Sequence, residues 1–165
     1  MNTENKFDLP LHSRVWIYQS SRKFTKQEIE KLCLEVNAFL EQWNSHGKEL
    51  TGEIRLLYDL FLVIALDEEK AMASGCSIDK SVRLVKDIEK EFGISLTGRT
   101  SIAYFDNEKN IQFKNFADLK KEIANGTVKD SVLIFNNLIS TLGDMQNGWI
   151  IPAKESWLMD VKVWD

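Results

Sequence analysis

The first apolar positions of the chain form a short run followed by a helical repeat. Residues 14–18 are rich in β-branched and aromatic side chains, which predicts a strand. Thr25 and Glu28 stand three residues apart, the spacing of a capping box that starts a helix. Apolar residues then recur every three or four positions, at Ile29, Leu32, Cys33, Val36, Leu40 and Trp43. We expect a helix from about Lys26 to Trp43, with Cys33 as a thiol of the core.

The next segment alternates and then becomes apolar throughout. Polar and apolar residues alternate over 53–58, while residues 60–66 are apolar on both faces. This pattern predicts a hairpin that turns at Asp59 and whose second strand is central in its sheet.

A second helix is expected after a loop over 67–76. Its apolar stripe consists of Ile78, Val82, Val85, Ile88 and Phe92, and Gly93 occupies the position that often ends a helix. Its charged residues are predicted to form a solvated face; they are Lys80, Arg83, Lys86, Glu89 and Lys90.

The rest of the chain predicts smaller elements. A hairpin is expected over 101–105 and 110–113, around the turn formers Asp106 and Asn107. A short helix should follow from Phe116 to a stop at Asn125 and Gly126, and then a strand over 132–135. We expect the tail over 151–165 to pack back on the body.

The predicted order β-α-β-β-α-β, followed by β-α-β, indicates an α+β fold. Its first six elements match a ferredoxin-like unit, which implies a mostly antiparallel sheet with helices packed on it. No repeat, low-complexity segment or linker interrupts the 165 residues, so a single globular domain over 1–165 is predicted.

The composition indicates which binding partners and which cellular compartment to expect. With 21 Lys and Arg against 25 Asp and Glu, the net charge is −4 and no basic block occurs, so nucleic acid is not an expected partner. The longest apolar run, residues 60–66, is far shorter than the roughly 20 residues that cross a bilayer. The polar N-terminus does not resemble a signal peptide, and two cysteines fit a reducing compartment. We therefore expect a cytoplasmic protein without membrane insertion.

The start of the second helix is the most unusual stretch, and it supplies the candidate ligand-binding residues Ser74, Gly75, Cys76, Ser77, Asp79 and Ser81. Free backbone N–H groups and the positive end of the helix dipole can hold an anion there or stabilise a thiolate. Ordinary capping is the competing interpretation, with Ser77 as N-cap and Gly75 in a tight turn that requires a positive φ.

Cys76 is also a candidate catalytic nucleophile, which would need a base. The chain offers His12 and His46, and His46 follows the first helix. We expect the end of that helix and the start of the second at different ends of the sheet, which argues against a dyad of Cys76 and His46. Residues 67–69 are three adjacent acids that could bind a hard cation such as Mg²⁺, but they are interpreted as solvated charge, so no metal site and no cofactor is predicted.

Two tryptophans near the C-terminus offer an alternative kind of site. Trp149 and Trp157 flank a segment of weak periodicity and could line a pocket or a partner interface, or pack in the core.

Four segments together resemble a known family: RVWIYQS (14–20), WNSHG (43–47), ASGCSID (73–79) and PAKESW (152–157). They are similar to small uncharacterised proteins of Bacteroidetes-type bacteria that often carry the label "ABC transporter ATPase". The resemblance spans nearly the whole chain and implies no catalytic or binding residues. The label conflicts with the sequence, because no glycine begins the G-x-x-x-x-G-K-[ST] pattern that cradles phosphates. We expect no ATPase activity.

Three functions remain open, in this order. The first is a binding module that holds a small anionic ligand or a protein partner at residues 74–81. The second is an interaction protein using the region of Trp149 and Trp157, and the third is an enzyme using Cys76.

Overall fold

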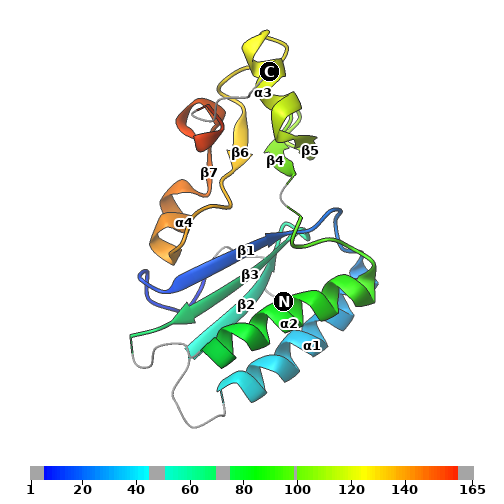
Figure 1. The fold of residues 1–165 in the computed structure, drawn as a ribbon, viewed down its shortest axis with the longest axis vertical. Helices are drawn as coiled ribbons and strands as arrows, with labels where there is room; N and C mark the ends of the chain where they lie inside the picture. Colours follow the sequence, from blue (N-terminus) through cyan, green and yellow to red (C-terminus); the bar gives the residue numbers. More distant parts are fainter. Residues whose placement is uncertain (1–5, 45–50, 70–74, 99, 160–165) are drawn as a thin grey trace. The chain divides into compact units, whose positions relative to one another are not determined.

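The computed structural model describes residues 6–44, 51–69, 75–98 and 100–159 (Figure 1). The chain forms two compact units, one of Met1–Thr97 with Leu138–Met145 and one of Gly98–Asn137 with Gln146–Asp165. Each unit has its own antiparallel sheet, so the prediction of an α+β fold with helices packed on antiparallel sheets is confirmed. No helix in these described ranges is both long and apolar enough to cross a membrane.

The sheet of the first unit contains β1 (Arg14–Gln19), β2 (Thr51–Leu57) and β3 (Phe61–Asp67) in the order β1-β3-β2. Strand β3 is central and buried along its whole length, as its uninterrupted apolar run predicts. The β2–β3 turn has positive φ at Tyr58 and Asp59 (56° and 54°), as in turns that match the twist of a hairpin.

Helices α1 (Lys26–Asn44) and α2 (Gly75–Phe92) lie side by side along this sheet (Figure 1). They run antiparallel: Phe24, just before α1, packs its ring 5.9 Å from that of Phe92, and Trp43 Nε1 donates to the Ser77 carbonyl over 3.2 Å. Their shared core includes Leu32, Val36, Ile54, Leu62, Ile64, Leu66, Val85 and Ile88. Cys33 lies at the edge of this packing and is half-buried, so the prediction of a core thiol is wrong.

The predicted separation of the end of α1 from the start of α2 is also wrong, as the Trp43–Ser77 contact shows. The pairing of Thr51 with Asp67 places the start of β2 beside the end of β3. Helix α1 precedes β2 and α2 follows β3, so the end of α1 and the start of α2 lie at the same end of the sheet.

The signals at the helix ends are largely confirmed. The Thr25 amide donates to Glu28 Oε2 over 2.8 Å and the Glu28 amide donates to Thr25 Oγ1 over 3.3 Å, which is the capping box at the start of α1. Gly93 follows α2 with φ +60°, the left-handed conformation that ends many helices.

The second unit contains β4 (Ser101–Phe105), β5 (Ile111–Asn115), α3 (Phe116–Ala124), β6 (Leu133–Phe135) and β7 (Ile150–Pro152). Its strands follow the order β5-β4-β6-β7, and the β4–β5 hairpin, α3 and β6 occur where the sequence predicts them. Two 3-10 turns, η1 (Ala153–Glu155) and η2 (Trp157–Met159), complete it. Leu158 and Ala153 join a core with Ile102, Leu119, Ile123 and Ile134, so the described part of the tail packs back as expected.

The predicted order β-α-β-β-α-β is present, but its fourth strand does not join the first sheet as in a ferredoxin-like unit. Strand β4 should pair with the first sheet, and instead it pairs with β5 and β6. The outer edge of β1 is bonded by another segment, because the Val15 amide donates to the Ser140 carbonyl over 2.9 Å and Arg14 bridges to Thr141. Thr141 precedes α4 (Leu142–Gly148), a helix that the sequence analysis missed.

Candidate functional site

The predicted helix start is only partly as expected. Helix α2 begins at Gly75, so Ser77 lies inside its first turn and is not the N-cap. Gly75 has no positive φ, and a Cβ added to it would meet nothing within 4 Å, so the tight-turn interpretation is wrong as well. The physical reason is that the helix starts earlier than its apolar stripe and includes this glycine. Ser74 and His46 lie outside the described residues.

The other members of that predicted site face different surroundings. Cys76 and Asp79 are exposed, and the Cys76 thiol has no hydrogen-bond partner among the described residues. Ser81 is buried and its hydroxyl donates to the Ile78 carbonyl over 2.7 Å. Ser81 therefore points into the helix packing, away from any ligand on the surface.

The two C-terminal tryptophans belong to the packing of the second unit. Trp149 is 2% exposed, its ring lies 5.3 Å from Phe135, and its Nε1 donates to Asn137 Oδ1 over 3.0 Å. Trp157 is half-buried against the core, and its buried Nε1 has no partner among the described residues. Trp149 is thus a core residue of the second unit.

A groove between α1 and α2 lies next to the predicted helix start. It has a volume of about 220 Å³ and is lined by Phe39, Gln42, Trp43, Lys80, Arg83, Leu84 and Asp87. The α1 residues stand at positions i, i+3 and i+4, and so do Lys80, Arg83 and Leu84 on α2, so each set forms one stripe of its helix. The antiparallel packing places these two stripes opposite each other.

The Trp43 side chain, which forms one wall of this groove, is held in place by contacts on several sides. Its ring lies 5.1 Å from that of Phe39, and its Nε1–H donates a hydrogen bond to the Ser77 carbonyl. Behind it, the Cα of Gly52 in β2 approaches so closely that an added Cβ would stand 2.7 Å from Trp43 Cζ3. The glycine therefore allows the indole to lie close against the sheet.

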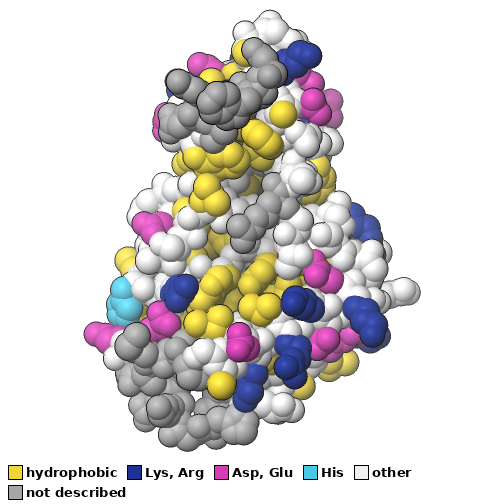
Figure 2. All heavy atoms as spheres, in the orientation of Figure 1, with side chains coloured by type: hydrophobic (Ala, Val, Ile, Leu, Met, Phe, Trp, Pro, Cys, Tyr) yellow, Lys and Arg dark blue, Asp and Glu magenta, His cyan; other side chains and the backbone are white. Residues whose placement is uncertain are grey.

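Charge in the groove is mixed, with two cations and one carboxylate. Lys80 and Arg83 are exposed, as a solvated face requires, and they also rim a concave surface. Figure 2 shows Lys and Arg side chains interspersed with Asp and Glu over α1 and α2. Glu89 departs from the predicted solvated face: burial acts to raise its pKa, but hydrogen bonds from Leu96 and Thr97 hold the pKa of its carboxyl below the usual range.

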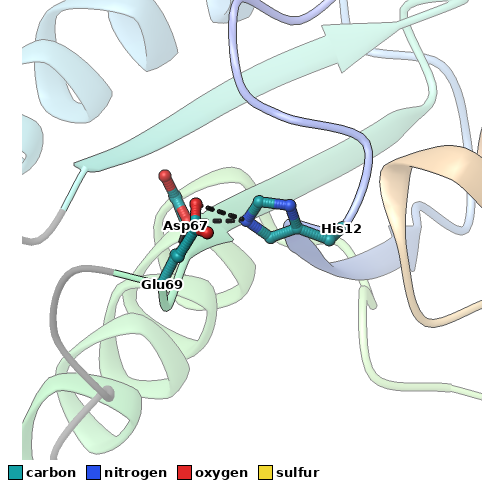
Figure 3. A group of neighbouring side chains, drawn as sticks. All are labelled: His12, Asp67 and Glu69. Atoms are coloured by element: carbon teal, nitrogen blue, oxygen red, sulfur yellow. Dashed lines mark hydrogen bonds and ion pairs between the residues drawn. The ribbon is translucent and has the colours of Figure 1, made fainter.

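A second cluster lies at the end of β3, where no site was predicted. His12 Nε2 is 3.1 Å from Asp67 Oδ1 and 3.5 Å from Glu69 Oε2 (Figure 3). One ligand atom from each of these three residues lies within 4.8 Å of the other two. His, Asp and Glu are all metal ligands, so this cluster is the candidate metal centre among the described residues.

Sequence reasoning missed both of these sites for a shared reason. Asp67 and Glu69 were recognised only as part of an acidic run, although their i, i+2 spacing at a strand end places them on one side. His12 is 55 positions from Asp67 and meets it only through the β1–β3 pairing. Lys80 and Arg83 have the right spacing, but of the α1 residues that face them the sequence analysis considered only Trp43, and only as part of the apolar stripe.

Comparisons with known proteins give no further identification. The resemblance to the bacterial family with the ATPase label therefore stays a prediction from the four sequence segments. No family model, no curated protein and no solved structure matches the chain.

Proposed function

We propose that this protein is a cytoplasmic binding module for a small organic anion with a flat apolar body, and that the ligand occupies the groove between α1 and α2. The observation that carries the proposal is the combination of a fixed indole, Trp43, with the two cations Lys80 and Arg83 in one concave surface. This deepens the prediction of an anion-binding module at residues 74–81, because Lys80 belongs to that stretch.

The size of the groove sets the size of the ligand. A cavity of about 150 Å³ holds a benzene molecule, so the groove of about 220 Å³ suffices for one aromatic ring with its acidic group. It is smaller than the roughly 300 Å³ at which drug-sized pockets begin. A single-ring carboxylate fits these dimensions better than a nucleotide does.

The arrangement of side chains sets the ligand's orientation. An aromatic ring can pack against Phe39 and Trp43, where ring pairs prefer offset or edge-to-face contact. Its carboxylate would then meet Arg83, whose guanidinium matches a carboxylate with two parallel hydrogen bonds, and Lys80. Asp87 at the same rim would repel a second negative charge and so favour monoanions over dianions.

The test uses benzoate and phenylacetate as probes and the indole N–H signals in NMR spectra of ¹⁵N-labelled protein. We expect the Trp43 signal, assigned with Trp43→Phe, to shift on titration while the Trp149 signal stays in place. Arg83→Ala should weaken binding about tenfold, as loss of a charged hydrogen bond does. Lys90→Ala, which removes an exposed cation of the same helix outside the groove, is the matched control.

Two results would refute the proposal. One is that neither aromatic carboxylate, nor any member of a wider panel of single-ring monoanions, shifts the Trp43 signal at millimolar concentration. The other is that Arg83→Ala and Lys90→Ala lower the affinity equally, which would indicate unspecific attraction by surface charge.

A further inference from the structure

The cluster at the end of β3 brings together three metal-ligating side chains from distant parts of the chain. Asp67 is the last residue of β3, Glu69 follows two positions later, and His12 precedes β1. Arg14 pairs with Leu66, so the start of β1 lies beside the end of β3 and carries His12 to the two carboxylates (Figure 3). The sheet register therefore fixes the meeting of these residues.

Local contacts direct the carboxylates to one side. The Glu69 amide donates to Asp67 Oδ1 over 3.0 Å, which bends the chain after the strand and holds Glu69 near Asp67. Glu68, between them, approaches Arg14 instead, with 4.0 Å between Oε1 and Nη1. The acidic run is thus divided into two residues facing His12 and one paired with a cation.

The distances fit a transition-metal ion. Zinc binds His nitrogen and carboxylate oxygen at about 2.0–2.2 Å, so neighbouring ligand atoms of a tetrahedral site stand roughly 3.3 Å apart. The two separations from His12 Nε2, 3.1 and 3.5 Å, lie on either side of that value. The third separation, between the two carboxylates, lies within 4.8 Å.

The charge and the exposure of the three side chains also fit a divalent metal ion. Two carboxylates and a neutral imidazole carry two negative charges, which a divalent cation balances. The Asp67 side chain is only 9% exposed, whereas His12 and Glu69 are 53% and 72% exposed. A buried anchor with two reachable ligands leaves at least one coordination position for water, as in zinc sites with three protein ligands.

We propose that His12 Nε2, Asp67 Oδ1 and Glu69 Oε2 bind a divalent first-row transition metal, with Zn²⁺ as the ion of best fit. The imidazole favours zinc over magnesium, which prefers oxygen ligands and its own water shell. On binding, the ion takes the place of the hydrogen bond between His12 Nε2 and Asp67 Oδ1. This site uses no residue of the groove and is independent of the ligand proposed there.

The test is calorimetric titration of the metal-stripped full chain with ZnCl₂, in a Cys76→Ser, His46→Gln background that removes the exposed thiol and the other histidine of the chain. We expect one ion per chain, and a Kd at least about tenfold weaker in His12→Gln and in Glu69→Gln, as lost ligands or their supports cause in other sites. Glu68→Gln is the matched control, because this neighbouring carboxylate faces Arg14, and its Kd should equal that of the parent.

A spectroscopic measurement distinguishes this site from unspecific binding. Co²⁺ in a tetrahedral site of one nitrogen and several oxygens absorbs visible light much more strongly than hydrated Co²⁺, and His12→Gln should abolish that absorption. His12 and Glu69 are exposed, and circular dichroism checks that all variants fold. The proposal is overturned if the parent takes up no Zn²⁺ at micromolar concentration, or if His12→Gln binds as tightly as Glu68→Gln.

Discussion

Gly52 and Trp43 fit each other at the level of single atoms, and this fit supports the groove. A Cβ at position 52 would lie 2.7 Å from Cζ3 and 3.1 Å from Cε3 of an indole that is 3% exposed. We predict that Gly52→Ala lowers the free energy of unfolding by about 1–3 kcal/mol, the usual cost of overpacking a core. Urea unfolding measures the loss, and the Trp43 indole signal should move because the ring must shift.

Gly75→Ala is the matched control for this substitution. Gly75 lies in the first turn of α2 without a positive φ, and the added methyl group would meet open space. Alanine favours helix over glycine, so we expect unchanged or slightly higher stability. If Gly75→Ala proves as harmful as Gly52→Ala, the close approach to Trp43 is not the cause of the loss.

The two cysteines differ in access, and alkylation should report the difference. Cys76 is exposed in the first turn of α2, whereas Cys33 is half-buried on α1. We predict that iodoacetamide labels Cys76 first in the native protein, and that labelling of Cys33 accelerates in urea, because access and thiolate fraction together set the rate. Mass spectrometry of timed samples identifies the site, and faster native labelling of Cys33 would contradict the placement of both thiols.

At the scale of elements, the start of α1 depends on an ion pair within its cap. The two terminal guanidinium nitrogens of Arg22 donate to Glu28 over 2.8 Å, and the Thr25 amide donates to the same carboxylate. These hydrogen bonds, that from Arg22 foremost, lower the pKa of Glu28 to about 2. A carboxyl whose pKa is lowered on folding stabilises the folded state at pH values above its pKa in the unfolded chain. This stabilisation is lost as the pH falls towards the pKa in the folded state.

We therefore predict that the stability difference between wild type and Glu28→Gln is largest above about pH 5 and shrinks as the pH falls from 4.5 towards 2. Urea unfolding at several pH values measures it. Glu30→Gln, an exposed carboxylate of the same helix, is the control and should change stability little. A difference that stays constant over this range would show that the ion pair does not act through the charge of Glu28.

The contact between the middle of α1 and the end of α2 contributes stability with the opposite pH dependence. Burial, followed by the hydrogen bond and the charge of Glu91, raises the pKa of Glu35 to about 7. Lys31 pairs with Glu91 in the same cluster, and the pKa of Glu91 is lowered. The folded state thus keeps a proton on Glu35 that the unfolded chain, at 4.5, gives up earlier.

Because the raised pKa favours folding at low pH, its contribution is complete below 4.5 and is lost as the pH rises through about 7. We predict that Glu35→Gln, which keeps a hydrogen-bond donor without a titrating proton, gains stability relative to wild type between pH 5 and 8. Thermal unfolding in matched buffers measures the trend. If Glu35→Gln changed stability equally at pH 5 and at pH 8, the folded state would not keep a proton on Glu35.

Periodicity predicted the longer elements and failed where tertiary contacts decide. The helices α1 and α2 and the apolar run of β3 are properties of the local sequence, and they appear as expected, although Val82 of the predicted α2 stripe is exposed. Helix α4 is short and buries only Leu142 and Met145, so it produces no readable stripe. Its one local signal was the pair Thr141 and Asp144, whose side chains hydrogen-bond over 2.7 Å in a capping arrangement.

At the scale of the whole molecule, the sites depend on how distant segments meet. Lys80 and Arg83 look like a solvated face until α1 lies opposite them, and His12 looks isolated until β1 pairs with β3. The sequence indicated the neighbourhood of the groove through the unusual stretch at the start of α2. It could not indicate the facing residues, because nothing local specified that α1 ends where α2 begins.

The connections between the two units bear on the prediction of a single domain. The segment Leu138–Met145 belongs to the first unit although the chain on both sides of it belongs to the second. It hydrogen-bonds to the first unit through Val15 to Ser140 (2.9 Å) and through Gly143 to Leu11 (2.8 Å). If the second unit unfolded alone, this segment would have to dock from flexible ends, which adds a loop-closure cost.

We therefore predict that the two units unfold together in one cooperative transition. Hydrogen exchange followed by mass spectrometry, at increasing urea concentrations, should show peptides from β3 and from β6 opening at one common midpoint, as two-state behaviour requires. A fragment of residues 1–97 lacks the segment and should be less stable than the same residues in the full chain, because the Val15 amide and the Ser13 carbonyl lose their partners Ser140 and Leu142. Two separate midpoints, or a fragment as stable as the full chain, would mean that the first unit folds without the segment and that the chain holds two domains.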